Sequence, residues 1–201
     1  MTIRSVCVYC GANPGLRPEY MQAAHELGRT LAAKGLRLIY GGSATGLMGA
    51  VADGALENGG EAVGVIPSAF ANRVGHTGLT ERHVVDTMHQ RKQMMFELSD
   101  AFIALPGGIG TMEEIFEMFT WAQLGFHKRP VGLLNISGYF DGLVAFTRHM
   151  AQERFLKDEH RSILLVEESP VSLLDCMTDW QPVCTSKLFT EAGAKLDLSK
   201  Q

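Results

Sequence analysis

Short apolar runs alternate along the chain with longer stretches in which apolar residues recur every three to four positions. Each short run is too brief and too uniformly apolar for an amphipathic helix, so it predicts a buried strand. The predicted strands are 5–10, 36–40, 61–66, 83–86, 101–105, 130–134 and 163–166. The helical spacing predicts helices over 18–34, over a stretch ending near 58, and over 87–99, 111–122, 138–155 and 169–179.

Local signals set the ends of several elements. Pro18 suits the first turn of a helix, and Gly35 is a typical C-terminal stop. Thr87 and Gln90 have the spacing of a capping box, which predicts that a helix opens there. Residues 69–79 show no clear period and are predicted to be a loop, and loops of this length in a compact domain often act as functional lids.

The alternation of strands and helices predicts an α/β fold: a Rossmann-like, doubly wound parallel sheet with helices on both faces. No internal repeat or linker divides the chain, so we expect one domain over residues 1–185 and a polar C-terminal tail over 186–201. Glycine-rich turns begin at Gly11, Gly41 and Gly107, each directly after a predicted strand. Ligands bind beyond the carboxyl ends of such sheets, so the three turns are predicted to share one crevice.

The turn after the strand at 101–105 carries the strongest chemical signal. Gly107, Gly108 and Gly110 allow close approach of backbone N–H groups to a ligand, and the start of the next helix favours an anion such as phosphate. Thr111 is a candidate N-cap and hydroxyl donor. Thr111 and Glu114 also have capping-box spacing, so a purely structural role for Glu114 stands beside a functional one.

Composition and charge limit the partners and the location that we expect for the protein. The chain has 201 residues, of which 46% are hydrophobic, and a net charge of −4 without a basic tract, so nucleic acid is not an expected partner. No apolar run reaches transmembrane length and no signal-peptide core is present, which predicts a cytoplasmic protein without membrane contact. The histidines are scattered and Cys7 and Cys10 lie along a strand, so we expect no metal and buried, reduced thiols.

None of the glycine-rich turns matches the dinucleotide fingerprint GxGxxG, and no Walker lysine follows them. A mononucleotide or a sugar phosphate suits the separate turns better. Arg91 and Lys92 fall early in the helix that opens at Thr87, close to the predicted crevice. Arg91 is in a position to reach a nucleotide or to pair with Glu114, although a solvated Arg-Lys pair is the more common reading.

The combination of motifs resembles a known family. The relevant stretches are YGGSATGLMG, MHQRK, ALPGGIGTMEE and TWAQLGFHKRPVGLLN. They are similar to the LOG family, the cytokinin riboside 5'-monophosphate phosphoribohydrolases, formerly labelled lysine decarboxylases. The resemblance runs from about residue 5 to 166 and implies a Rossmann-like homodimer that needs no cofactor. It also implies a hydrolase that cleaves the N-glycosidic bond of AMP or of N6-modified AMP.

The resemblance also implies roles for individual residues. The catalytic arginine and glutamate of the family fall on Arg91 and Glu114. The implied substrate-binding residues are Gly42, Ser43, Arg91, Lys92, Gly107, Gly108, Gly110, Thr111, Glu113, Glu114 and Thr120. Many relatives have serine where this chain has Ala12 and glycine where it has Ser43, and their loop glutamate has no clear counterpart in 69–79. We expect Met94, Met95 and the 69–79 segment to be candidates for lining the base pocket.

Two further readings of the same fold compete with the hydrolase. One is a carrier or sensor that binds a nucleotide-like ligand without cleaving it, and the other is an enzyme acting on a different phosphosugar. A carboxylate beside a bound phosphate favours catalysis, because a simple phosphate binder does not need one. Large apolar residues on more than one side of the motif helix, including Phe116, Phe119 and Trp121, fit either a dimer contact or core packing.

Overall fold

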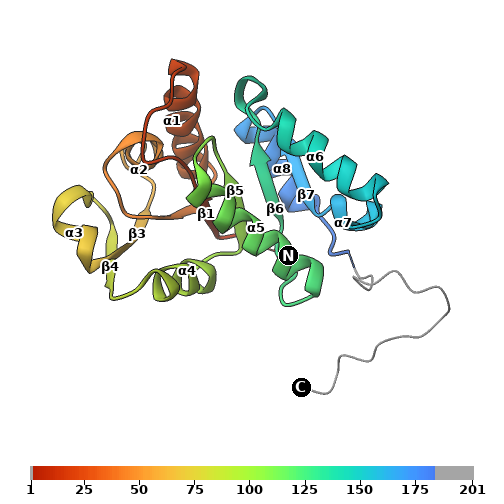
Figure 1. Cartoon of the computed structure of the whole chain (residues 1–201). Helices are drawn as coiled ribbons and strands as arrows, with labels where there is room; N and C mark the ends of the chain where they lie inside the picture. Colours follow the sequence, from red (N-terminus) through yellow and green to blue (C-terminus); the bar gives the residue numbers. More distant parts are fainter. Residues whose placement is uncertain (1, 184–201) are drawn as a thin grey trace.

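A computed structural model describes residues 2–183, and the 186–201 tail predicted above lies outside them. Within the described residues the strands form a parallel, seven-stranded sheet in the order β4-β3-β2-β1-β5-β6-β7 (Figure 1). The strands are β1 (Ser5–Tyr9), β2 (Arg37–Tyr40), β3 (Ala62–Pro67), β4 (Glu81–Val85), β5 (Ala101–Ala104), β6 (Val131–Leu134) and β7 (Leu164–Glu167). The predicted Rossmann-like fold is therefore confirmed.

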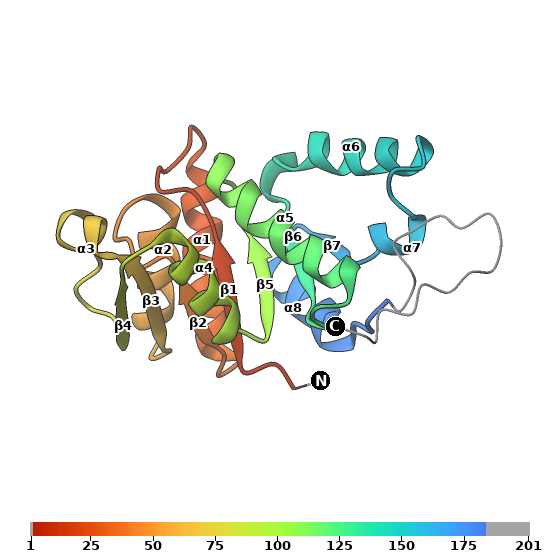
Figure 2. The same ribbon diagram turned by 60° about the horizontal axis from the view of Figure 1, so that its bottom comes forward.

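Helices cover both faces of the sheet, which is why the central strands are apolar throughout. The helices are α1 (Pro18–Ala33), α2 (Gly46–Leu56), α3 (Ser68–Val74), α4 (Met88–Glu97), α5 (Ile109–Leu124), α6 (Asp141–Gln152), α7 (Asp158–Arg161) and α8 (Pro170–Asp179). Helices α1, α2 and α8 share one buried cluster with the sheet, and α4 and α5 share the cluster on the opposite face. Figure 2 shows α4 and α5 on the same face.

The chain reverses direction across the sheet between β1 and β5. From β1 it runs outward through β2, β3 and β4, and it then returns to place β5 beside β1. Neighbouring strands whose connections lead in opposite directions leave a crevice beyond their carboxyl ends. This topology places the turns after β1 and β5 at the point where ligands bind in such folds.

The alternation of side chains along β1 agrees with the sequence-based expectation for its cysteines. Cys10 packs in the cluster beneath α1 and α2, whereas Cys7 packs in the cluster beneath α4 and α5. Both are buried free thiols, so the CxxC spacing does not form a paired site. Cys176 on α8 is also free and is partly buried, and Cys184 lies outside the described residues.

Two predicted elements differ from the structure. Residues 68–74 form helix α3 rather than part of a loop, and the guanidinium of Arg82 on β4 donates a 2.8 Å hydrogen bond to the carbonyl of Ala71 within it. The helix expected over 138–155 is shorter, because a single 3-10 turn, η1 (Ile136–Gly138), precedes α6.

Among the described residues, no helix is both long and apolar enough to cross a membrane.

The aromatic residues of α5 are accounted for by the core. Phe119 is buried in the cluster beneath α4 and α5, and Phe116 and Trp121 pack against that cluster. Trp121 also makes an edge contact with Phe96, at 5.0 Å between ring centroids. These residues therefore give no independent argument for a dimer, which continues to depend on the family resemblance.

Candidate active site

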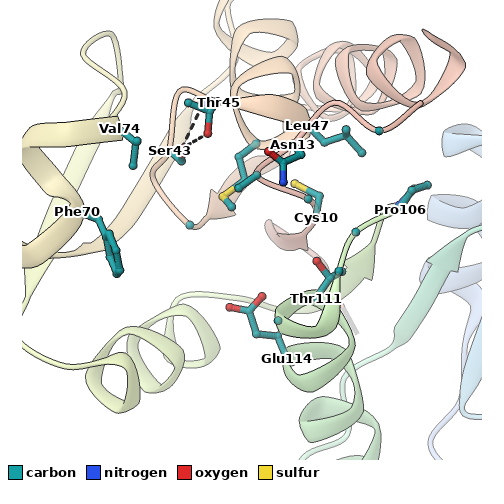
Figure 3. A pocket seen from close by; sticks show the side chains of 18 of the residues that line it. Cys10, Asn13, Ser43, Thr45, Leu47, Phe70, Val74, Pro106, Thr111 and Glu114 are labelled. Atoms are coloured by element: carbon teal, nitrogen blue, oxygen red, sulfur yellow. Dashed lines mark hydrogen bonds between the residues drawn. The ribbon is translucent and has the colours of Figure 1, made fainter. Parts of the chain in front are cut away.

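A cavity of about 680 Å³ opens at the carboxyl ends of β1, β2, β3 and β5, within the size range of small-molecule sites (Figure 3). All three glycine-rich turns contribute to its lining, through Gly11, Gly41 and Gly107. The prediction that they share one crevice is therefore confirmed.

Close backbone contacts join the turn after β1 to the turn after β5 and to the start of α2. The N–H of Gly11 donates to the carbonyl of Pro106 at 3.0 Å, and the N–H of Leu47 donates to the carbonyl of Gly11, also at 3.0 Å. A Cβ atom at Gly107 would overlap with the Thr111 hydroxyl and would come within 2.8 Å of the Gly11 nitrogen. Glycine at position 107 is thus required by packing, independently of any ligand.

Helix α5 presents an uncapped N-terminus to the cavity. Its N-cap is Gly108, and none of the described side chains caps the helix. Thr111 lies inside the first turn and is buried, so its predicted role as N-cap is wrong. A Cβ atom at Gly108 or Gly110 would meet nothing within 4 Å, although both residues line the cavity. Packing therefore does not explain these two glycines, whereas a ligand drawn close to the helix N-terminus would.

Arg91 of α4 and Glu114 of α5 form a buried ion pair at the cavity wall. Arg91 is 7% exposed and Glu114 is 8% exposed, and one guanidinium N–H donates directly to Oε1 of Glu114. The Nε–H of Arg91 donates to the carbonyl of Val65 at 3.1 Å. A Cβ atom at Gly41 would overlap with Nη2 of Arg91, so the glycine makes room for the guanidinium.

The carboxylate of Glu114 is engaged by Arg91 and not by the helix start. It is not part of a capping box, so the helix-capping role considered for this residue is wrong. Burial raises the pKa of Glu114, and the adjacent Arg91 partly counters the rise by favouring the ionised form. A buried carboxyl with a raised pKa, facing a cavity, suits proton transfer or stabilisation of a developing positive charge.

The wall opposite α5 is apolar. It is formed by side chains from α2, β3, α3 and α4, namely Met48, Ile66, Phe70, Val74 and Met88. Figure 3 shows Phe70 and Val74 on one side of the cavity and Pro106 and Thr111 on the other, with the Glu114 carboxylate directed into the space between them. The cavity therefore has an apolar end and an end rich in backbone donors.

The 69–79 segment lines the cavity as expected, but the two methionines expected beside it do not. Met95 is fully buried in the core, and Met94 packs against the same core cluster. Met48 and Met88 occupy the cavity wall instead. Both lie at the first turn of a helix that follows a sheet strand, a position that the topology could have indicated.

The structure separates the predicted site residues into two groups. Those that line the cavity are Ser43, Arg91, Gly107, Gly108, Gly110, Thr111 and Glu114. Gly42, Lys92, Glu113 and Thr120 are not among its lining residues. The Lys92 ammonium instead pairs with Glu113 and, at 3.1 Å, with Glu117 on the outer side of α5.

Sequence reasoning missed several polar and aromatic groups at the cavity. Asn13 and Thr45 belong to the turns after β1 and β2, and the Thr45 hydroxyl lies 2.9 Å from that of Ser43. Tyr20 and Tyr139 add aromatic rings near the α5 end. Asn13 and Thr45 could have been found by inspecting the predicted turns, but no local pattern marked Tyr139.

Titratable groups elsewhere do not form a metal centre. In residues 2–183, no cluster of three or more histidine, cysteine, aspartate or glutamate side chains has the geometry to hold a metal ion. His89, which lies within the MHQRK motif, is exposed on α4 and lines a small outer cleft together with Lys92. It does not reach the cavity lining.

Sequence comparisons match the chain to one family of proteins. Residues 48–177 match the family model described as "Possible lysine decarboxylase". The chain is 51% identical over 167 residues to the cytokinin riboside 5'-monophosphate phosphoribohydrolase of Rhodococcoides fascians, covering 82% of this chain and 84% of that protein. It is 42% identical over 180 residues to the phosphoribohydrolase LOG of Oryza sativa subsp. japonica, covering 89% of this chain and 74% of the relative.

Solved structures with the same fold include proteins of a different kind. The molybdenum cofactor binding protein of Rippkaea orientalis superposes with a TM-score of 0.68 at 22% identity, covering 89% of this chain and 98% of that one. The Moco carrier protein of Chlamydomonas reinhardtii gives a TM-score of 0.69 at 20% identity, covering 89% of this chain and 97% of its own. At these identities the likeness shows the shared fold alone.

Proposed function

The chain belongs to the LOG family of cytokinin riboside 5'-monophosphate phosphoribohydrolases, and from this premise we propose how its cavity works. The protein is a hydrolase that cleaves the N-glycosidic bond of AMP or of N6-modified AMP, and it releases the free base and ribose 5-phosphate. The observation that carries the assignment of its site is the buried Arg91–Glu114 pair between a donor-rich end and an apolar end of one cavity.

The donor-rich end suits the 5'-phosphate. The first N–H groups of a helix lack intrahelical partners, and the helix dipole adds partial positive charge at this end. At α5 no side chain caps these donors, and Gly108 and Gly110 leave room for an anion to approach. The Thr111 hydroxyl lies beside Gly107, in the turn that precedes α5. Binding energy from the phosphate would then hold the ribose in place for reaction at C1'.

The apolar end suits the base. With the phosphate at α5, the ribose extends past Glu114 and the base reaches the wall formed by Met48, Phe70 and Met88. An apolar wall accommodates the flat faces of a purine as well as an isopentenyl substituent at N6. AMP and N6-prenylated AMP are therefore both members of the substrate class that we propose.

Glu114 is the group that we assign to the chemistry. Cleavage of the bond between C1' and the purine nitrogen leaves positive charge on the ribose, as in glycoside hydrolysis. The Glu114 carboxylate stabilises this oxocarbenium-like state and accepts a proton from the water that attacks C1'. The bonding electrons leave with the purine, which takes up a proton to become the free base. The products are the free base and ribose 5-phosphate.

Arg91, the partner of Glu114 in the ion pair, supports the reaction. Its guanidinium is fixed by the carbonyl of Val65 and by Glu114, so its orientation is set before substrate binds. It favours the ionised form of Glu114, counteracting burial. It also lies where it can offset the negative charge that develops on the departing purine.

Two other functions, a nucleotide carrier and a pyridoxal-phosphate decarboxylase, are less well supported by the site. A carrier needs no buried carboxylate in its binding cavity, yet Glu114 lies between the two ends of this one. A pyridoxal-phosphate decarboxylase needs a lysine for its Schiff base. The described residues that line the cavity include no lysine, and Lys92 is engaged by Glu113 and Glu117.

We propose that the protein forms a homodimer, as the family resemblance implies. We also propose that it functions in the cytoplasm, as its sequence pattern predicts. Sedimentation at micromolar concentration tests the first point, and a monomer under assay conditions would contradict it. Fractionation of source cells tests the second, and recovery outside the cytoplasmic fraction would contradict it.

The proposed function is tested by following its products. Purified protein is incubated with AMP, with isopentenyladenosine 5'-monophosphate and with the corresponding unphosphorylated ribosides, and free base and ribose 5-phosphate are quantified by chromatography. We expect base release from the monophosphates and far less from the ribosides, because the latter lack the group held by α5. Tight binding of intact nucleotide without base release would favour the carrier.

A further inference from the structure

A rigid turn after β6 carries Tyr139 to the rim of the cavity. Ser137 adopts a left-handed conformation with φ 51°, which is rare for residues other than glycine and is often retained at functional sites. The following Gly138 has φ +71°, and a Cβ atom there would lie 2.6 Å from the Asp141 carboxylate. The Asn135 side chain fixes the turn by accepting from the N–H of Phe140 at 2.7 Å and donating to Asp141 at 2.8 Å.

The Tyr139 side chain reaches from this turn to the glycine turn after β5. Its hydroxyl donates a hydrogen bond to the carbonyl oxygen of Gly107. Its ring packs edge-on against Tyr20, at 5.6 Å between centroids, and against Phe140 at 5.0 Å. Tyr139 also lines the cavity, but it has no part in the mechanism described above.

The bonded carbonyl belongs to the peptide that joins Gly107 to Gly108, the N-cap residue of α5. Gly107 and Gly108 are adjacent glycines, which tolerate a wide range of backbone conformations. A Cβ atom at Gly108 would meet nothing, so neighbouring side chains do not restrain this residue. In a planar trans peptide, the carbonyl of Gly107 and the N–H of Gly108 point in opposite directions. Holding the carbonyl therefore sets the direction of an N–H at the N-cap of α5.

We propose that Tyr139 is a positioning residue for the phosphate-binding turn, an inference that rests on the proposed function. By holding the Gly107 carbonyl, its hydroxyl keeps the Gly107–Gly108 peptide from rotating and presenting a carbonyl oxygen to the bound anion. Tyr139 thus acts through the backbone rather than on the reacting atoms. Its contribution is to phosphate affinity and not to the chemical step.

The test compares Tyr139→Phe with Tyr40→Phe. Tyr40 is buried outside the cavity lining, and within residues 2–183 its hydroxyl has no hydrogen-bond partner, so its variant is a matched loss of one hydroxyl group. Loss of one hydrogen bond is worth roughly a 2- to 12-fold change in an equilibrium constant. We expect Tyr139→Phe to raise KM for AMP and the Kd for ribose 5-phosphate by about 5-fold each, with kcat changed less than about 3-fold. Tyr40→Phe leaves all three values unchanged.

Calorimetric binding of ribose 5-phosphate separates this inference from the proposed function, since it needs no turnover. If the wild-type protein binds ribose 5-phosphate but does not cleave AMP, the proposed function fails while Tyr139 is still tested. Equal Kd values for wild type and Tyr139→Phe would overturn the positioning role. A fall in kcat with unchanged KM would also overturn it, because it would place Tyr139 at the reacting centre.

Discussion

The two ends of the cavity are built in different ways. At the α5 end, backbone hydrogen bonds and close glycine contacts interlock the turns after β1 and β5, and a buried ion pair adjoins them. At the α3 end, apolar side chains form the wall, and one of them, Phe70, is 48% exposed. The first end is held mainly by backbone atoms, and the second presents side chains on a helix of only seven residues.

This difference corresponds to two tasks. Cleavage requires a fixed distance between the phosphate, C1' and the catalytic carboxylate, and backbone geometry provides this precision. Recognition of a base requires apolar surface whose shape can vary with the substituent. We therefore expect substitutions at the α5 end to affect rate or phosphate affinity, and substitutions at the α3 end to affect preference among bases.

The largest effect is expected at the carboxylate between the two ends. Glu114→Gln retains an acceptor for Arg91 but cannot take a proton, and we expect kcat for AMP to fall roughly 100- to 1000-fold while the protein still folds. Glu113→Gln is the matched control, because the neighbouring carboxylate is exposed and pairs with Lys92. It should change kcat less than about 3-fold. Equal rates for wild type and Glu114→Gln would rule out the catalytic assignment.

The pH profile offers a second way to examine the same carboxylate. Because the ionised form of Glu114 is the active one, activity is lost as pH falls through its pKa. Burial raises this pKa, so the acid limb of kcat/KM should lie above the ordinary glutamate value of 4.5. Below the limb the rate should fall about tenfold per pH unit. A flat profile extending below pH 4.5 would show that another group limits the reaction.

Alanine variants of Gly110 and Gly107 distinguish a glycine required for ligand binding from one required for packing. Gly110→Ala places a methyl group in open space within the first turn of a helix, so it should stabilise the fold slightly, by up to about 1 kcal/mol. We nevertheless expect its KM for AMP to rise about 10-fold, since the cost of overpacking against a bound phosphate is roughly 1–3 kcal/mol.

The partner variant, Gly107→Ala, forces a methyl group against Thr111 and Gly11 and should lower the free energy of unfolding by about 1–3 kcal/mol. Thermal denaturation and steady-state kinetics of both variants provide the comparison. If Gly110→Ala binds AMP as wild type does, the phosphate does not approach this turn.

The smallest effect is expected at the α3 end. Phe70→Ala removes apolar surface from the wall proposed for the base, so KM for isopentenyladenosine 5'-monophosphate should rise about 3- to 10-fold, which corresponds to about 0.7–1.4 kcal/mol of lost contact. The Kd of ribose 5-phosphate should not change, because that ligand has no base. A weakened affinity for ribose 5-phosphate would break the proposed division between the two ends.

Much of the donor-rich end could be predicted from the sequence because its signals are local. Strand, glycine turn and helix follow one another directly around Gly107, and parallel topology brings such turns to one edge. The pairing of Arg91 with Glu114 was one of the alternatives that the sequence left open, because their helices start at the same edge of the sheet. Thr111 was misread because an N-cap and a first-turn threonine look alike when the helix start is uncertain by a few residues.

The apolar end could not be predicted in the same way. Helix α3 spans only Ser68–Val74, which is too short for a hydrophobic period to be recognised. Its carbonyl at Ala71 accepts a hydrogen bond from Arg82 of the following strand, β4, a contact that no local pattern in the sequence marks. Tyr139 reaches the cavity from the turn after β6, which no local pattern marked, so only the three-dimensional arrangement identifies it. For Lys92 the sequence motif predicted a cavity residue that the structure does not place there. Although it is next to Arg91 in the chain, Lys92 pairs with Glu117 on the outer side of α5.

The most direct test is the crystal structure of Glu114→Gln with AMP bound, since the variant should hold the nucleotide without cleaving it. We predict that the 5'-phosphate lies at the N-terminus of α5, beside Gly108 and Gly110. We also predict that C1' lies next to residue 114 and that the adenine contacts Phe70 on α3. A phosphate bound beside Ser43 and Thr45, or an adenine against α5, would contradict the assignment of the two ends.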